Sequence, residues 1–298
     1  MSRLVCLGMI VKDIVFYVPH MPPMPQKLTA NSLRIGFGGM AATAAAAAAA
    51  LGGEVEFWGR VGDDYIGVEA VQALTARGVE PRVKVIADAQ SAVSAVIVDD
   101  AGERMLAVYP GHMDPASDWL PLDRLNGVQA VHADFRWIEG ARALYLAAQK
   151  LGCPRVLDAD AGDVRALEIL IPLANHIIFS ERGLASFSND KPVEQALLDV
   201  AAERDVVVGV TLGERGSLFV HRGQLQAFAA PKVKAHDTNG AGDVFHGAYA
   251  LAMTRAMPWP EAVRYATAAA SLKCTSAQGW SQLPSHDEVL VFMNGQTC

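Results

Sequence analysis

Four short apolar runs between residues 128 and 220 constrain the fold of this chain more than any other feature. "AVHAD", "RVLDAD", "HIIFS" and "VVVGVTLG" each end in small or polar residues, and helix-like segments separate them. Strands that alternate with helices predict crossover units, and therefore a parallel sheet covered by helices. A chain of 298 residues, 51% of them hydrophobic, can bury one core of this size. The pattern predicts a single α/β domain over residues 1–298.

Two β-rich ribbons interrupt this pattern in the N-terminal half. Residues 14–37 place alternating apolar residues around a proline-dense turn, which predicts a hairpin or an edge ribbon. Residues 91–112 flank an Asp-Ala-Gly-Glu turn, which predicts a hairpin. The alanine run that begins at Ala41 predicts a helix packed close to neighbouring backbone, because alanine combines high helix propensity with a small side chain. A last helix is predicted from Trp259 to about Cys274.

Composition and charge exclude several classes of function. The net charge is -7 and the basic residues are scattered, so the chain lacks the basic footprint of a nucleic-acid-binding protein. The apolar stretch near the N-terminus is too short for a signal peptide or a membrane span. The cysteines form no metal-binding or CxxC spacing, which indicates reduced thiols and a cytoplasmic protein; they are Cys6, Cys153, Cys274 and Cys298.

Polar residues collect where predicted strands end. Open α/β sheets bind their ligands beyond the carboxyl ends of the strands, so these residues are the candidates for a site. Asp13 follows the first strand, which is predicted to run from Arg3 to Leu7. The others are Asp134, Asp158, Asp160, Ser180, Glu181 and Thr211.

The stretch "DTNGAGDVFHGAYALAM" places a glycine-rich turn and a carboxylate at the start of a helix-like run. Gly240, Ala241 and Gly242 allow the backbone to approach a ligand, and the helix that follows offers unpaired amides and the positive end of its dipole. This predicts an anion cradle, beside which Asp243 is placed to act as a base in phosphoryl transfer. The alternative for the isolated string is an ordinary acid at a helix N-terminus.

Other phosphate-binding and nucleotide-binding motifs are missing from the sequence. It contains no GxxxxGK[ST] loop and no HRD or DFG set of the protein kinases. No GxGxxG fingerprint follows the first strand, which disfavours a hydride-transfer enzyme.

Two motifs about two hundred residues apart resemble the signatures of the ribokinase-like (PfkB) carbohydrate kinases. "GFGGMAATAAAAAAALGGEVEFWGRVGDDYIG" is similar to their N-terminal glycine signature, and "DTNGAGDVFHGAYALAM" is similar to their C-terminal one. The resemblance implies a ribokinase-like three-layer sandwich with a mainly parallel central sheet and a small β-ribbon lid. It also implies ATP and Mg²⁺ as cofactors, a sugar substrate and a homodimer formed through the lid ribbons.

The resemblance assigns roles to individual residues. It implies that Asp243 is the catalytic base and that Gly240, Ala241 and Gly242 form the anion hole. Asp13, Gly38 and Gly39 match the positions that bind the sugar. The residues that match the nucleotide segment, in "VTLGERG", are Thr211, Gly213 and Gly216; for Gly216 the alternative is a simple turn glycine.

Two departures from the family pattern limit this transfer of roles. Many members carry an Asn-x-x-Glu element for the magnesium shell, but here Ser180 and Gly183 stand at those positions, with Glu181 as a possible substitute. The protein ligands of the metal are therefore unknown. The Asn that usually follows the paired glycines is absent, and "GGMAAT" offers Met40 and Thr43 instead.

Several segments, among them "DFRWIEGA" and "FSERGLA", are most similar to the sulfofructose kinase branch. In that branch a lysine and an arginine grip a sulfonate at C6, and Lys27 and Arg136 stand at the matching places. The alternatives are a solvated lysine and an arginine paired with Asp134 and Glu139. A polar Asn of the branch is replaced by Val108.

The resemblance implies O1 phosphorylation of a ketohexose with an anionic C6 substituent, such as 6-deoxy-6-sulfofructose. The alternatives are kinases for fructose, tagatose, ribose, 2-keto-3-deoxygluconate or a nucleoside. A catalytically silent sugar-binding protein on the same scaffold is the alternative from a different class.

Overall fold

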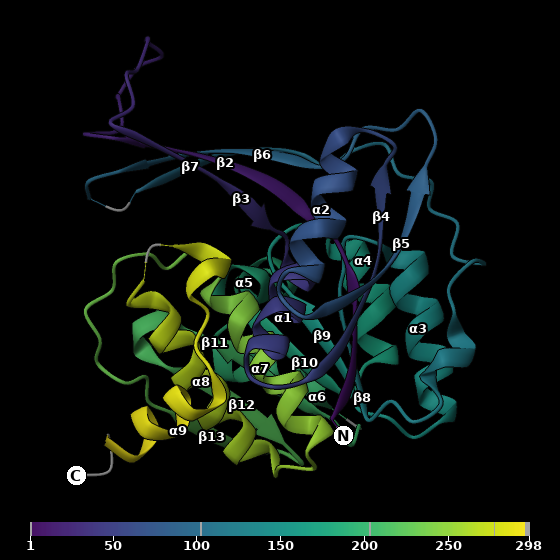
Figure 1. The fold of residues 1–298 in the computed structure, drawn as a ribbon. Helices are drawn as coiled ribbons and strands as arrows, with labels where there is room; N and C mark the ends of the chain where they lie inside the picture. Colours follow the sequence, from purple (N-terminus) through teal and green to yellow (C-terminus); the bar gives the residue numbers. More distant parts are fainter. Residues whose placement is uncertain (1, 102, 203, 277, 296–298) are drawn as a thin grey trace.

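The computed structural model describes residues 2–101, 103–202, 204–276 and 278–295 as a large sheet with helices on both faces and a smaller sheet above one edge (Figure 1). The large sheet has the order β13-β12-β11-β10-β9-β8-β1-β4-β5 and is parallel from β5 to β11. The predicted α/β class with a mainly parallel sheet is confirmed. Its strands are β1 Arg3–Gly8, β4 Glu54–Gly62, β5 Val79–Ile86, β8 Ala130–Asp134, β9 Arg155–Ala159, β10 His176–Ser180, β11 Val207–Thr211, β12 Ser217–His221 and β13 Gln224–Phe228.

Each face of the large sheet packs against its own set of helices. The core of one face takes buried residues from α1 Met40–Ala50, α2 Tyr65–Thr75, α7 Ala241–Thr254, α8 Trp259–Cys274 and α9 His286–Gly295. The core of the other face takes them from α3 Ile138–Lys150, α4 Val164–Leu170, α5 Glu181–Ser188 and α6 Val193–Ala201. The helix predicted at 259–274 is confirmed, whereas α9 and the short 3-10 helix η4 Gly279–Gln282 were not predicted.

The small sheet contains both ribbons and has the order β3-β2-β6-β7. Its strands are β2 Val11–Val18, β3 Ser32–Gly38, β6 Val93–Asp99 and β7 Arg104–Tyr109. The two hairpins join because β2 and β6 pair in parallel. Asp13 lies inside β2, so its expected position directly after the first strand is wrong: β1 ends at Gly8, and the chain enters the small sheet within two residues. We call this four-stranded sheet the lid.

The alanine-rich helix α1 packs between β1 and α7 at very close range. Residues 41–48 of α1 are all buried. A Cβ atom added to Gly247 of α7 would stand 2.2 Å from the carbonyl oxygen of Ala44, so the two backbones nearly touch. Small side chains on both helices are therefore a requirement of the packing and explain the alanine run. Among the described residues, no helix is both long and apolar enough to cross a membrane.

Gly247→Ala should lower the free energy of unfolding by about 1–3 kcal/mol, because its methyl group overpacks the contact with α1. Gly295→Ala in α9 is the matched control, since nothing lies within 4 Å of the added methyl. That variant should leave stability unchanged or raise it slightly through helix propensity. Urea unfolding of both variants measures the difference, and equal stabilities would contradict the close approach of α1 and α7.

Candidate active site

A cavity of about 730 Å³ opens between the lid and the carboxyl edge of the large sheet. The ends of β8, β9, β10 and β11 contribute one wall, the lid strands contribute another, and the N-terminus of α7 lies at the floor. Of the residues predicted to form a site, those that line it are Asp13, Gly38, Gly39, Arg136, Asp158, Asp160, Ser180, Thr211, Gly240, Gly242 and Asp243. The cavity thus brings together residues that are more than two hundred positions apart.

Asp134 connects three of the segments that form the cavity. Its carboxylate is completely buried and accepts hydrogen bonds from the backbone amides of Met9 (2.9 Å), Ala41 (3.2 Å) and Arg136 (2.9 Å). Burial raises the pKa of this carboxyl, and the three amides oppose the rise. A Cβ atom on Gly8 would stand 2.1 Å from the carboxylate, so only glycine leaves room for it.

The sugar-binding candidates meet where the lid joins the large sheet. Asp13 accepts a hydrogen bond from the hydroxyl of Ser94 on the neighbouring strand (2.5 Å). A Cβ atom on Gly38 would lie 2.2 Å from the Asp13 carboxylate, and Gly39 has a φ of 97° at the start of α1. Burial raises the pKa of Asp13, while Ser94 and Arg34 oppose the rise. The glycines leave the carboxylate accessible from the cavity.

The glycine turn forms the N-terminus of α7. Gly240 is the N-cap with a left-handed φ of 74°, and the amide of Ala241 donates to the carbonyl of Thr238 (3.2 Å). Among the described residues, the amides of Gly242 and Asp243 have no backbone acceptor, as expected in a first helical turn. A Cβ atom on Gly242 would meet nothing within 4 Å, so this glycine leaves open space on the cavity side.

Asp243 has the electrostatic environment of a base. Desolvation by burial, and then the charges of Asp160 and Asp134, raise its pKa to about 7, while the Lys273 ammonium opposes the rise. Lys273 is itself almost fully buried, lines the cavity and donates to the carbonyl of Asp237 (2.9 Å). Sequence analysis missed Lys273 because it lies within the regular pattern of α8.

The polar residues at the ends of β9 and β10 are the candidate magnesium ligands, because their side chains carry oxygen atoms. Ser180 caps α5 through the amide of Gly183 (2.9 Å) and donates to Asp160 (2.5 Å). Glu181 instead pairs with Arg215 (2.5 Å) and does not line the cavity. Among the described residues, Asp160 is left with one oxygen that has no protein donor. Since Mg²⁺ prefers carboxylate oxygen and water, Asp160 is the residue that fits it.

The predicted nucleotide segment reaches the cavity through one residue. Thr211 ends β11 and lines the cavity. Gly213 has a φ of 60° with open space around it, but it lies outside the cavity lining. Gly216 also lies outside, and a Cβ atom there would stand 2.0 Å from the carbonyl oxygen of Phe228. The geometry of Gly216 is therefore explained by the turn between β11 and β12.

Two arginines line the cavity with no carboxylate within ion-pair distance among the described residues. Arg136 is exposed, stacks on Phe135 at 4.4 Å and donates to the carbonyl of Ala161 (3.3 Å); its guanidinium is attracted to Asp134 without an ion pair between the two. Arg60 stacks on Trp137 at 4.1 Å, and burial lowers its pKa to about 10, which leaves it charged at neutral pH. Sequence analysis missed Arg60 because it lies inside β4.

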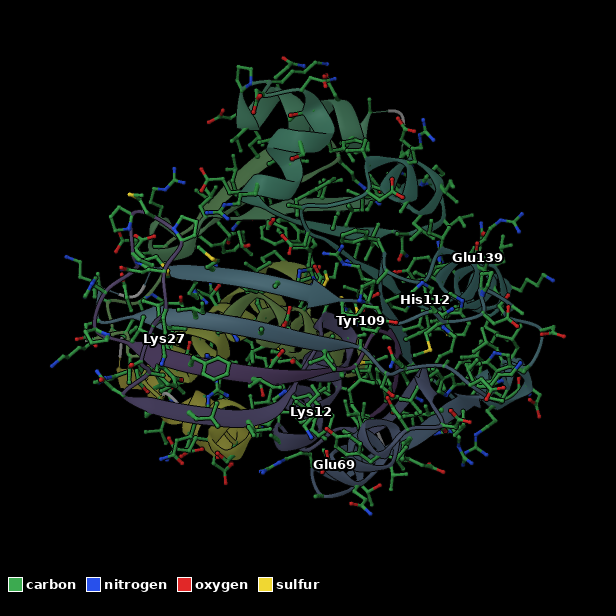
Figure 2. All side chains as sticks on the ribbon, turned by 90° about the horizontal axis from the view of Figure 1, so that it is seen from above. Lys12, Lys27, Glu69, Tyr109, His112 and Glu139 are labelled. Atoms are coloured by element: carbon green, nitrogen blue, oxygen red, sulfur yellow. The ribbon has the colours of Figure 1, made fainter. Side chains whose placement is uncertain are left out.

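Lys27 lies away from these arginines. It is exposed on the loop between β2 and β3 and does not line the cavity. Figure 2 shows it at the opposite end of the lid from Tyr109 and His112. Within one chain, the structure therefore does not bring Lys27 and Arg136 together.

The residues that replace family positions also line the cavity. Met40 and Thr43 project from the start of α1, and the hydroxyl of Thr43 accepts a hydrogen bond from the indole of Trp280 (3.0 Å). Val108 contributes an apolar surface from β7. These side chains give that part of the wall fewer polar groups than an Asn would provide.

The lid touches the glycine turn directly. Arg104 on β7 donates hydrogen bonds to the hydroxyl of Thr238 and to the side-chain oxygen of Asn239 (3.4 Å). Both acceptors belong to the loop that leads into α7. The lid therefore lies in contact with the proposed anion-binding loop.

Comparison with known proteins agrees with this geometry. A model described as pfkB family carbohydrate kinase matches residues 1–285. A ribokinase from Haemophilus influenzae is 26% identical, with 98% of each chain covered, and a fructokinase from Vibrio alginolyticus is 27% identical, with 86% of this chain and 91% of that protein covered. The crystal structure of an Agrobacterium tumefaciens protein, provisionally named a ribokinase, has a TM-score of 0.95 and 32% identity over 99% of this chain and 98% of that one. The ribokinase-like fold is thereby confirmed.

Asp134→Ala should destabilise the protein by about 2–4 kcal/mol, because three backbone amides lose a common acceptor in a largely buried place. Asp163→Ala is the control: Asp163 caps α4 through the amide of Arg165 (3.0 Å), and its loss should cost about 1 kcal/mol. Urea unfolding compares the two. A loss for Asp134→Ala no larger than that of the control would show that Asp134 does not hold the three segments.

Proposed function

Because this chain belongs to the pfkB family of carbohydrate kinases, we propose that it transfers the γ-phosphoryl group of ATP to O1 of a ketohexose that carries an anionic group at C6, such as 6-deoxy-6-sulfofructose. That the enzyme is an ATP-dependent carbohydrate kinase follows from the family and from its ribokinase and fructokinase relatives. The identity of the sugar is the part that the proposal adds.

One observation carries the reaction type. Asp243 lies in the same cavity as the Asp13 carboxylate and immediately beside the free amides at the start of α7. A sugar held through its hydroxyls by Asp13 and a phosphoryl group held by the amides would meet at Asp243. This is the arrangement that phosphoryl transfer needs, since catalysis there depends on positioning and on stabilising charge.

In the proposed mechanism, Asp243 accepts the proton of the sugar hydroxyl. The oxygen of that hydroxyl attacks the γ-phosphorus of ATP, and the bond between the γ-phosphorus and the leaving ADP breaks. The amides of Gly242 and Asp243, with Gly240 shaping the turn, stabilise the negative charge on the transferred group. Ala241 contributes to the helix end, although its own amide is occupied by Thr238. Thr211, together with the neighbouring Gly213, would border the nucleotide. A pKa of about 7 allows Asp243 to hold the proton after transfer.

Magnesium fits this proposal through Asp160. When bound with ATP, the ion would neutralise charge on the phosphate oxygens. Ser180 would orient the Asp160 carboxylate through their hydrogen bond. Glu181 is not part of this proposal, because it pairs with Arg215.

The unpaired arginines support an anionic acceptor. Arg60 and Arg136 bring two positive charges to the cavity wall, and among the described residues neither has a carboxylate within ion-pair distance, although acidic residues lie farther off. A guanidinium offers a planar set of donors that suits sulfonate, phosphate or carboxylate. We therefore propose Arg60 as the second cation of the anion grip beside Arg136.

Other acceptors remain alternatives to be tested. Fructose, tagatose, ribose and 2-keto-3-deoxygluconate differ in whether they carry a charge opposite the arginines, and a nucleoside would need an aromatic slot for its base. A silent sugar-binding protein would have no use for a base with a raised pKa beside free helix amides.

The lid supports the proposal of a homodimer. Leu33, Ile35 and Met105 on its strands are each more than half exposed. Burial of such apolar surface against a second lid would stabilise a dimer. In that dimer, Lys27 of one chain could approach the cavity of its partner. Light scattering that gives the mass of one chain would contradict this. We place the reaction in the cytoplasm, where ATP is supplied.

Asp243→Asn should lower kcat by on the order of a hundredfold or more while ATP and sugar still bind, because the amide cannot accept the proton. Coupled ADP release measures turnover, and calorimetry measures binding. The variant should be at least as stable as wild type at pH 8: a carboxyl whose folded pKa is raised favours folding at low pH and loses that contribution as the pH rises through about 7. Near-normal turnover would refute the role of Asp243.

The pH dependence of the wild-type enzyme provides an internal check. The value of kcat/KM should fall about tenfold per unit below pH 7, where Asp243 becomes protonated, and should level off above it.

Arg136→Gln and Arg60→Gln should each lower kcat/KM for sulfofructose about 10- to 100-fold, the cost of losing a hydrogen bond to a charged group, with little change for fructose. Lys150→Gln is the control, because Lys150 is an exposed residue of α3 that does not line the cavity, and it should leave kcat/KM for both sugars unchanged. Equal losses of kcat/KM for sulfofructose and fructose in the arginine variants would overturn the proposal of an anionic acceptor. A wild-type preference for a neutral aldopentose would overturn it as well. A loss of kcat/KM for sulfofructose but not for fructose in Lys27→Gln would show that Lys27 of a partner chain contributes to the site.

A further inference from the structure

Three potential metal ligands lie together beneath the floor of the cavity. His132 projects from β8, Asp158 from β9 and His246 from α7. Each is at most 3% exposed. Their ligand atoms all lie within 4.8 Å of one another, and Nε2 of His246 is 3.2 Å from an oxygen of Asp158. Two imidazoles and a carboxylate thus share one small buried space.

This cluster has an unusual deficit of hydrogen bonds. Both ring nitrogens of His132, Nδ1 of His246 and one oxygen of Asp158 have no partner among the described residues. Buried polar atoms are nearly always paired, because an unpaired one loses its hydrogen bonds to water without replacement. The two nitrogens of His132 carry most weight, since His246 and Asp158 already contact each other through Nε2 and one oxygen, and they indicate that a further group belongs beside His132. Two histidines with a carboxylate suit a transition metal, since Mg²⁺ prefers an all-oxygen shell.

We propose that His132, Asp158 and His246 bind a divalent transition-metal ion, with zinc as the best fit. Zinc ligands at about 2.0–2.2 Å from the ion lie roughly 3.4 Å apart in a tetrahedron. The Asp158 and His246 atoms already have this spacing, so a shift of roughly 1–1.5 Å by the ring of His132 would complete the set. Three protein ligands leave a fourth position for water or a substrate oxygen.

The surrounding charges favour a cation. Asp134, Asp160 and Asp243 all act electrostatically on Asp158, and Arg136 is the cation that opposes them. An ion with two positive charges would offset this concentration of carboxylates. Asp158 and His246 line the cavity, whereas His132 lies behind them, so an ion could enter from the cavity and settle against His132.

The site is distinct from the magnesium ion that accompanies ATP. That ion fits Asp160 at the end of β9 and needs the nucleotide phosphates, whereas the proposed site has its own two nitrogen ligands and needs no nucleotide. Binding can therefore be measured without ATP, sugar or turnover.

The test uses the full chain, stripped with a chelator and dialysed, with Zn²⁺ and Co²⁺ as probes. Equilibrium dialysis should give one tightly bound Zn²⁺ per chain, and Co²⁺ should produce visible absorption bands of a four-coordinate site. His132→Gln keeps the side-chain volume and should weaken Zn²⁺ binding at least tenfold. Zn²⁺ should raise the Tm of the wild type and leave that of His132→Gln unchanged, provided circular dichroism shows that the variant is folded.

His221→Ala is the matched control, because His221 pairs with Asp205 on the surface (3.1 Å) and should not affect tight binding. Asp158→Asn provides a second variant if His132→Gln does not fold. Equal Zn²⁺ affinity in wild type and both cluster variants would overturn the proposal, as would the absence of tight binding in the wild type, which would leave water as the occupant. Displacement of Zn²⁺ by equimolar Mg²⁺ would also overturn it, since the site would then be of the oxygen type.

Discussion

The buried carboxylate of Asp134 is the interaction on which the active-site cavity depends. It accepts hydrogen bonds from three backbone amides: Met9 after β1, Ala41 in the first turn of α1 and Arg136 after β8. One side chain therefore sets the relative positions of three segments. A carboxylate that forms no ion pair with any of the described residues is costly to bury, and three amide donors, with the charge of Arg136, offset that cost. The requirement extends to Gly8, which has no room for a side chain beside it.

The chemistry of the cavity follows from where the parallel strands end. Because β8, β9, β10 and β11 finish at one edge, their last residues gather carboxylates and hydroxyls beneath the lid. This gathering also raises the pKa of Asp243, since each acid is desolvated close to others. Strand topology thus contributes to the raised pKa of the residue that we propose as the base, and α7 places beside it the two amides that we propose to bind the phosphoryl group.

Sequence patterns predicted the parallel sheet, the two ribbons and the glycine turn, because each has a local signal in residue spacing. The position of Asp13 could not be predicted in this way. Only two residues separate β1 from β2, and they carry no turn signal, so one apolar run continued into the next. Arg60 and His132 were also missed. Each lies inside a strand, where the pattern of apolar residues predicts the strand but not which side chains come together in space. Helix α9 was missed for another reason, because its apolar residues show little helical periodicity.

The contact of Arg104 with Thr238 and Asn239 joins the lid to the loop that leads into α7. This contact can contribute free energy only while the lid lies against the loop. By reciprocity, whatever orders the loop stabilises the lid in that position by the same amount. In the proposed mechanism, a sugar that held the lid against this loop would therefore also order the loop for ATP. For products to leave past the lid these hydrogen bonds would have to break, so the same contact would also slow product release.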